Sequence, residues 1–167
     1  AVNTVRVTRK NEKPFLKGFN TDAPAFRQSL LDNLSSLPES AVVLGTGGAS
    51  KSVVYVLTDL GIRVVQVSRT SGKGIYSYRT LPAEAIRNAG LIVNTTPVGM
   101  APDTDQAPPL DYSNLREGQL LFDLIYNPPQ TRFMQIGEEH GCMAVNGLDM
   151  LHYQAEMAWE IWNGATG

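Results

Sequence analysis

The residues of this sequence best suited to binding a phosphate form a glycine-rich stretch, Gly45 to Ser52, that follows a short apolar segment. Gly45 and Gly47, followed by small residues, resemble the turn of a dinucleotide-binding fold, in which backbone N–H groups approach a pyrophosphate. The same stretch differs by one substitution from the P-loop of nucleotide hydrolases, with Lys51 and Ser52 in the lysine and hydroxyl positions. The two interpretations predict different chemistry.

Apolar strands and amphipathic helices alternate around this loop. The apolar residues 41–45 are typical of a strand buried on both faces of a parallel sheet, and the spacing of Val53, Val54, Leu57 and Leu60 predicts a helix from Gly48 to Leu60. Further strands are expected at 62–68, 91–97, 119–125 and 143–146, and further helices at 22–34, 81–90, 130–140 and 148–162. This order predicts an α/β fold, a Rossmann-like doubly wound parallel sheet with helices on both faces. Two strands around a polar turn at 10–14 are expected to precede it.

Details of the loop bear on the choice between the two interpretations. Ser50 stands where the P-loop has glycine, at a point where the backbone wraps closely around phosphate. In a dinucleotide fold the third position needs only a small residue, which Ala49 or Ser50 supplies. Asp123, at the end of "LLFD", is where a hydrolase would hold magnesium, although any core strand can end in Asp. The loop alone leaves both interpretations open, together with a simple chain reversal.

The end of the next predicted strand favours one cofactor over another. An NAD site usually carries Asp or Glu about 20 residues after the glycine turn, where it accepts hydrogen bonds from the ribose. Here the strand ends in Ser68, Arg69 and Thr70. A guanidinium and two hydroxyls suit the 2'-phosphate of NADP, while the structural alternative is a solvated arginine at a strand end.

Composition excludes several classes of function. With 167 residues, 43% of them hydrophobic and 18% charged, the chain suits one globular domain. A net charge of -2 without a basic run argues against nucleic acid and anionic membrane surfaces, and no apolar run reaches the length of a membrane span. The single cysteine, Cys142, excludes an internal disulfide and a multi-cysteine metal site, so a cytoplasmic location and no bound metal are expected.

Seven segments together resemble one enzyme family along nearly the whole chain. They are "AVNT", "GFNTD", "VVLGTGGASKSVVYVL", "VSRT", "LIVNTTPVGM", "FDLIYNPPQT" and "VNGLDMLHYQA". In this order and with similar gaps they are similar to the C-terminal, NADP-binding part of shikimate dehydrogenase. Such a set is far more specific than one glycine pattern, and it removes most of the weight from the hydrolase interpretation.

The resemblance implies reversible, NADP-linked reduction of 3-dehydroshikimate to shikimate. Hydride passes between the nicotinamide and the ring carbonyl carbon while a protein group handles the proton on oxygen. The family uses a lysine and an aspartate there. Asp22 matches the aspartate, and its alternative role is a helix cap. The matching lysine would precede Ala1, so we expect these 167 residues to be a cofactor-domain fragment that is inactive alone.

The resemblance also assigns binding roles. Asn3, Asp22, Tyr126 and Gln154 match positions that face the substrate. The residues implied in cofactor binding are Gly45, Thr46, Gly47, Gly48, Ala49, Ser68, Arg69, Thr70, Thr96, Gly147 and Met150. The tyrosine, the glutamine and the methionine also suit ordinary core or helix positions, so a non-catalytic nucleotide-binding module remains an alternative function.

The resemblance divides the chain into two parts. Residues 1–22 match remnant strands of the N-terminal substrate-binding domain, and residues 23–167 match the NADP-binding domain. A truncated domain boundary exposes surface that is normally covered, so self-association through residues 1–22 is expected. The segment after Thr70 is shorter than in the family, which predicts that the usual helix is missing there, with Tyr76 and Tyr78 as core edges or stacking surfaces. Pro97, Pro108 and Pro109 are candidates for a cis bond.

Overall fold

The computed structural model describes residues 2–10 and 13–164 and consists of a parallel sheet, flanking helices and a separate hairpin. The strands are β1 (Thr4–Lys10), β2 (Lys13–Phe19), β3 (Ser40–Leu44), β4 (Arg63–Ser68), β5 (Ile75–Ser77), β6 (Leu91–Asn94), β7 (Leu120–Asp123) and β8 (Met143–Val145). The helices are α1 (Asp22–Asp32), α2 (Gly48–Asp59), α3 (Ala83–Arg87), α4 (Arg132–Glu139) and α5 (Leu148–Asn163), with a short 3-10 helix, η1 (Tyr112–Asn114).

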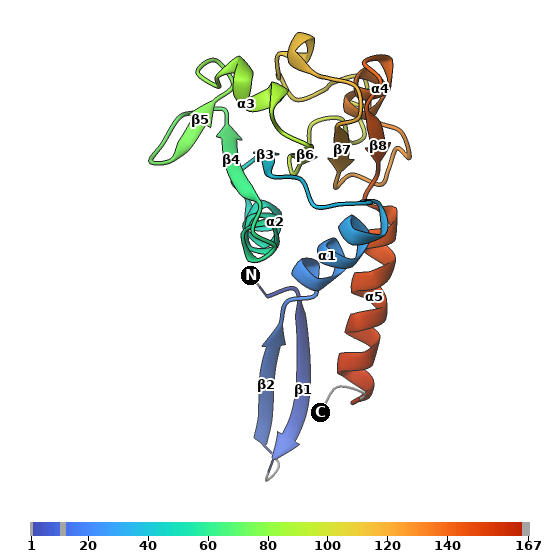
Figure 1. The fold of residues 1–167 in the computed structure, drawn as a ribbon. Coiled ribbons are helices and arrows are strands. Elements are labelled where there is room, and N and C mark those ends of the chain that lie inside the picture. The colour runs from blue at the N-terminus through green and yellow to red at the C-terminus, as the bar shows by residue number, and fades with distance from the viewer. Residues whose placement is uncertain (1, 11–12, 165–167) are drawn as a thin grey trace.

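The main sheet has six parallel strands in the order β5-β4-β3-β6-β7-β8 (Figure 1). The chain enters this sheet at the inner strand β3 and continues through β4 to β5 at one edge. It then returns to β6, on the other side of β3, and continues through β7 to β8 at the opposite edge. This reversal of strand order beside β3 is the switch point at which ligands of open α/β sheets bind. The predicted doubly wound fold is confirmed.

Side chains alternate between two cores, one on each face of the sheet. Ala41 and Val43 of β3 belong to a core shared with α1, α2 and α5. Val42 and Leu44 of the same strand belong to a second core with α3, η1 and α4. Because β3 is buried on both faces, its sequence is a continuous apolar run rather than an alternating one.

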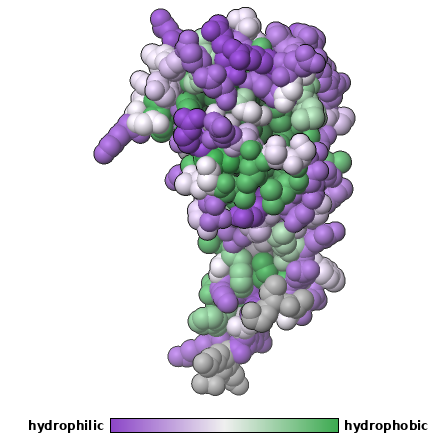
Figure 2. Space-filling view, in the orientation of Figure 1, coloured by the Kyte–Doolittle hydropathy of each residue, from purple (hydrophilic) through white to green (hydrophobic). Residues whose placement is uncertain are grey.

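The first two strands form an antiparallel hairpin outside the main sheet, and it extends away from the body alongside the end of α5 (Figure 1). The Trp162 indole donates to the carbonyl oxygen of Val5 over 3.1 Å, which ties the hairpin to α5. Positions 11 and 12 of the expected turn lie outside the described residues. Hydrophobic surface is visible both on the body and on the upper part of the hairpin (Figure 2).

Local details differ from the sequence-based expectations in three places. The N-cap of α1 is Thr21, and Asp22 is the first helical residue, with no side-chain capping bond. The described segment after Thr70 has no helix, as expected, but it contains the short strand β5, which was not expected. The cis peptide bonds precede Pro102 and Pro128 rather than the three candidate prolines. No helix in the described part of the chain is long and apolar enough to cross a membrane.

Candidate cofactor and substrate site

The glycine turn leaves β3 at Gly45 and enters α2 at Gly48. Gly45 has a φ of +114°, and a Cβ there would lie 2.5 Å from the Thr95 hydroxyl oxygen. Its N–H donates to the carbonyl oxygen of Val67 over 2.8 Å, which fixes the turn beside β4. The position therefore requires glycine both for its backbone conformation and for the close approach of Thr95.

The helix start separates the two interpretations of this loop. Gly47 is the N-cap of α2, so Lys51 lies a full turn inside the helix and is exposed. Ser50 is fully buried and accepts a 3.0 Å hydrogen bond from Gln66 of β4, whose amide nitrogen also donates to the carbonyl oxygen of Gly45. Ser50 thus provides the small third position that packs helix against strand, as in a dinucleotide turn. This geometry argues against the P-loop interpretation, in which the lysine must face the phosphates.

A cavity of about 490 Å³, the loop cavity, lies against this turn. Its wall contains Gly45, Thr46 and Gly47 from the turn, Ser68 and Arg69 from the end of β4, Thr96 after β6, and also Tyr78. The unpaired N–H groups at the start of α2 favour an anion here. Gly48 and Thr70 do not line the loop cavity, although both are adjacent in sequence to residues that do.

A smaller cavity of about 210 Å³, the α5 cavity, lies where α1, α5 and the end of β7 meet. It brings together the predicted residues Asp22, Ala49, Tyr126, Gly147, Met150 and Gln154. These residues come from chain segments up to 132 positions apart, the difference between 154 and 22. Glycine at position 147 lets the start of α5 pack closely against the segment after β7, because a Cβ there would overlap the backbone of Leu124.

Asn3 is hydrogen-bonded to Asp22 and does not itself line a cavity. Its amide nitrogen donates to a carboxylate oxygen of Asp22 over 2.7 Å and to the Thr21 hydroxyl over 3.0 Å, and its own oxygen accepts from the N–H of Thr21 at 2.9 Å. These bonds join the start of the hairpin to the start of α1. Asn3 therefore orients the Asp22 carboxylate beside the α5 cavity.

A third cavity of about 490 Å³, the central cavity, adjoins the other two. It shares Thr95, Thr96 and Pro97 with the loop cavity, and Ala49, Leu124 and Tyr126 with the α5 cavity. A continuous row of cavities thus follows the carboxyl edge of the sheet from Arg69 to Gln154. Leu124 lines two of these cavities but was not predicted from the sequence. It directly follows β7, and its apolar side chain gives no sign of a binding role.

A buried polar network supports the loops between these cavities. The Asp123 carboxylate accepts hydrogen bonds from the Asn94 amide at 3.0 Å, the Ile125 N–H at 3.1 Å and the Thr131 hydroxyl at 2.6 Å. Asn94 in turn accepts from the N–H and the hydroxyl of Thr96. Burial raises the pKa of Asp123 to about 6, and the three hydrogen bonds oppose this rise. Asp123 is thus enclosed by protein donors rather than open to magnesium.

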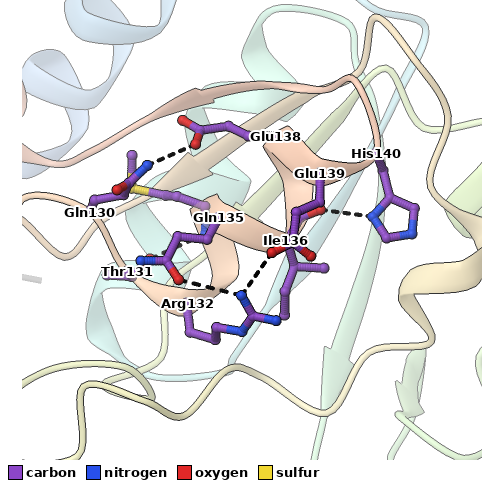
Figure 3. A network of polar contacts seen from close by, with 9 residues as sticks. Gln130, Thr131, Arg132, Gln135, Ile136, Glu138, Glu139 and His140 are labelled. Carbon is purple, nitrogen blue, oxygen red and sulfur yellow. Dashed lines mark hydrogen bonds and ion pairs between the residues drawn. The ribbon is translucent and has the colours of Figure 1, made fainter.

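Polar contacts on α4 form a separate surface cluster (Figure 3). Arg132 pairs with Glu139 at 2.9 Å, Gln130 donates to Glu138 at 2.7 Å, and the His140 ring contacts the carbonyl oxygen of Ile136 at 2.8 Å. None of these residues lines the three cavities. The contacts stabilise the helix and its ends. Within the described ranges, no group of three His, Cys, Asp or Glu side chains is placed to hold a metal ion.

Known proteins are similar to this chain in both sequence and fold. Shikimate dehydrogenase (NADP(+)) of Carboxydothermus hydrogenoformans is 34% identical over 99% of this chain and 63% of its own length, and that of Thermus thermophilus is 37% identical over 98% and 62%. The Aquifex aeolicus shikimate dehydrogenase structure matches with a TM-score of 0.81 at 34% identity, over 98% of this chain and 62% of that one.

A Thermus thermophilus shikimate 5-dehydrogenase structure in complex with NADP(H) and shikimate matches with a TM-score of 0.79 at 34% identity, covering 95% and 61% of the two chains. No family model matches the chain. The chain spans about three fifths of the length of the relatives that it matches.

Proposed function

We propose, because this chain is related to shikimate dehydrogenases over nearly its whole length, that it is the NADP-binding part of such an enzyme. The enzyme would reduce 3-dehydroshikimate reversibly to shikimate. The observation that carries the proposal is the row of cavities along the sheet edge, with the glycine turn and Arg69 at one end and Asp22 and Gln154 at the other. Phosphate-binding groups and substrate-type polar groups thus lie on one continuous surface.

In this proposal the loop cavity holds the adenosine and pyrophosphate part of NADP. The turn formed by Gly45, Thr46, Gly47, Gly48 and Ala49 binds the pyrophosphate through backbone N–H groups, while Ser68, Arg69 and Thr70 meet the 2'-phosphate. Thr96, Gly147 and Met150 border the nicotinamide end. NADPH supplies the hydride. The protein holds the cofactor in position, because the turn and the strand ends that contact it are fixed by backbone hydrogen bonds.

The α5 cavity is the proposed substrate end. Asp22, oriented by Asn3, offers a carboxylate that accepts hydrogen bonds from substrate hydroxyls and takes part in proton transfer, and Tyr126 and Gln154 contribute further polar contacts. The lysine that the resemblance implies matches no position in these 167 residues. The proposal therefore gives this polypeptide cofactor binding and part of the substrate site, without turnover by itself.

The remaining proposals concern organisation. Residues 1–22, the hairpin and its exit, would belong to the substrate-binding domain, and residues 23–167 would form the cofactor domain. The hairpin supports this division because it forms a sheet of its own. A small-molecule substrate is bound by a relative of known structure, the Thermus thermophilus enzyme in complex with shikimate. A cytoplasmic location, favoured by the single cysteine, completes the proposal.

Calorimetric titration tests the cofactor assignment. The chain is expected to bind NADPH more tightly than NADH and to show no binding of magnesium ATP. Arg69→Ala should weaken NADPH binding by about 50-fold, equivalent to about 2.3 kcal/mol, because it removes a charge-assisted contact to the 2'-phosphate. NADH binding should change little.

Arg63→Ala is the matched control, since Arg63 is an exposed arginine at the opposite end of the same strand. This variant should bind both cofactors as the unmodified chain does. Equal loss of NADPH and NADH affinity in Arg69→Ala would contradict the 2'-phosphate role. Binding of neither cofactor would favour the non-catalytic module, and tight binding of magnesium ATP would revive the hydrolase interpretation.

Self-association through the hairpin is part of the proposal. Val7, Phe15 and Leu16 are exposed on β1 and β2, and Trp159 and Trp162 are exposed on the adjoining α5. Exposed apolar side chains on strands with unpaired edges favour pairing with another copy. Light scattering should show a concentration-dependent dimer that Leu16→Glu abolishes. Leu37→Glu, at an exposed leucine between α1 and β3, should leave it intact, and a strict monomer at high concentration would refute the idea.

A further inference from the structure

Tyr78 lies at the Arg69 end of the loop cavity, and the proposed cofactor site gives it no role. It follows β5, the short strand in the segment after Thr70. Its backbone N–H donates to the carbonyl oxygen of Ser68 over 3.3 Å, which holds it beside the end of β4. Tyr78, Ser68 and Arg69 thus line the same part of the loop cavity.

The Tyr78 side chain contacts both the core and the loop cavity. Its ring packs against the core formed with α3, η1 and α4, so the ring is held in place. Its hydroxyl makes no hydrogen bond to any part of the chain that the structure describes, and the charge of Arg69 acts on it. Burial raises the pKa of Tyr78, so the hydroxyl keeps its proton and stays a donor at neutral pH.

We infer that Tyr78 is a specificity-determining residue of the cofactor site, whose hydroxyl donates a hydrogen bond to the 2'-phosphate beside Arg69. The inference rests on the proposed NADP site. A phosphate group offers several acceptor lone pairs, and one guanidinium satisfies only some of them. A neutral donor fixed next to Arg69 adds a bond that a ribose without this phosphate cannot accept in the same place. Tyr78 therefore favours NADP over NAD without adding charge.

The test uses the smallest ligand pair that differs in this phosphate, adenosine 2',5'-bisphosphate and AMP, titrated calorimetrically into the 167-residue chain. Tyr78→Phe removes the hydroxyl and keeps the packed ring. The variant is expected to bind adenosine 2',5'-bisphosphate about tenfold more weakly, as for loss of a hydrogen bond to a charged group. Its affinity for AMP should be unchanged.

Tyr76→Phe is the matched control, because Tyr76 lies two residues earlier, is 42% exposed and does not line the loop cavity. It should bind both ligands normally. Unchanged binding of the bisphosphate by Tyr78→Phe, or an equal loss of both ligands, would overturn the inference. If the unmodified chain bound neither ligand nor NADPH, the proposed function would fail first and this inference with it.

Discussion

Gly147→Ala is expected to lower the free energy of unfolding by about 3 kcal/mol, at the upper end of the usual cost of overpacking. A Cβ at this position would overlap the carbonyl group of Leu124 and would lie 3.2 Å from its Cα. Backbone atoms cannot turn aside as a flexible side chain can, so the strand end and the start of α5 must move apart. The hydrogen bond from the Gly147 N–H to the carbonyl oxygen of Ile125, 3.0 Å long, should be lost with that movement.

The same variant should also weaken NADPH binding by about tenfold, or about 1.4 kcal/mol, because Gly147 and Met150 border the nicotinamide end of the proposed cofactor site. Urea unfolding and calorimetry measure the two effects. Gly72→Ala is the control, since Gly72 has no atom within 4 Å of an added Cβ and its φ is not positive. A Gly147→Ala variant as stable as Gly72→Ala would show that the contact with Leu124 is not restrictive.

Gly147 also illustrates what a sequence can predict about a site. The resemblance implied that glycine lies near the nicotinamide, where close backbone approach is needed. The partner in that approach, Leu124, is 23 positions away, the difference between 147 and 124, and comes from another strand end. Periodicity predicted both elements correctly, but no local pattern specifies which backbone atoms meet when α5 packs against the sheet.

The strands were predictable for a related reason. β3, β6 and β7 are short apolar runs because both of their faces are buried, and each is bounded by turn residues. β5 was missed because it has only three residues, lies at the sheet edge and carries no apolar run. Its effect on the site is large relative to its length, since it delivers Tyr78 to the loop cavity.

Asp123 shows the limit of motif reasoning most clearly. At the end of "LLFD" it matched a magnesium ligand and an ordinary core residue equally well. The structure surrounds it with donors from three segments, Asn94, Ile125 and Thr131. Because these bonds hold the loops after β6 and β7, they position Thr96 and Tyr126 on either side of the central cavity. Asp123 thus lines none of the three cavities, but it helps to position Thr96 and Tyr126, which do.

The charge of Asp123 is expected to make stability depend on pH in an unusual direction. Its pKa is about 6 in the folded protein, against about 3.9 for an unperturbed Asp. Between these values the folded state binds more protons than the unfolded state, so stability from this group is fully present below about pH 3.9. It is lost as pH rises through about 6. At 1.36 kcal/mol for each pKa unit, the loss approaches about 3 kcal/mol.

Asp123→Asn isolates this contribution, because the amide has a similar shape and does not titrate. The unmodified chain contains other carboxylates, but these are common to both proteins and cancel in the difference between them. Urea unfolding from about pH 4 to about pH 7 covers most of this change, so the stability advantage of the unmodified chain over the variant should shrink by about 2.3 kcal/mol as pH rises. Loss of the bond from Thr131 should make the variant the less stable protein at about pH 4. Parallel stability curves for the two proteins would mean that the Asp123 carboxyl keeps its ordinary pKa, because its three hydrogen bonds cancel the effect of its burial.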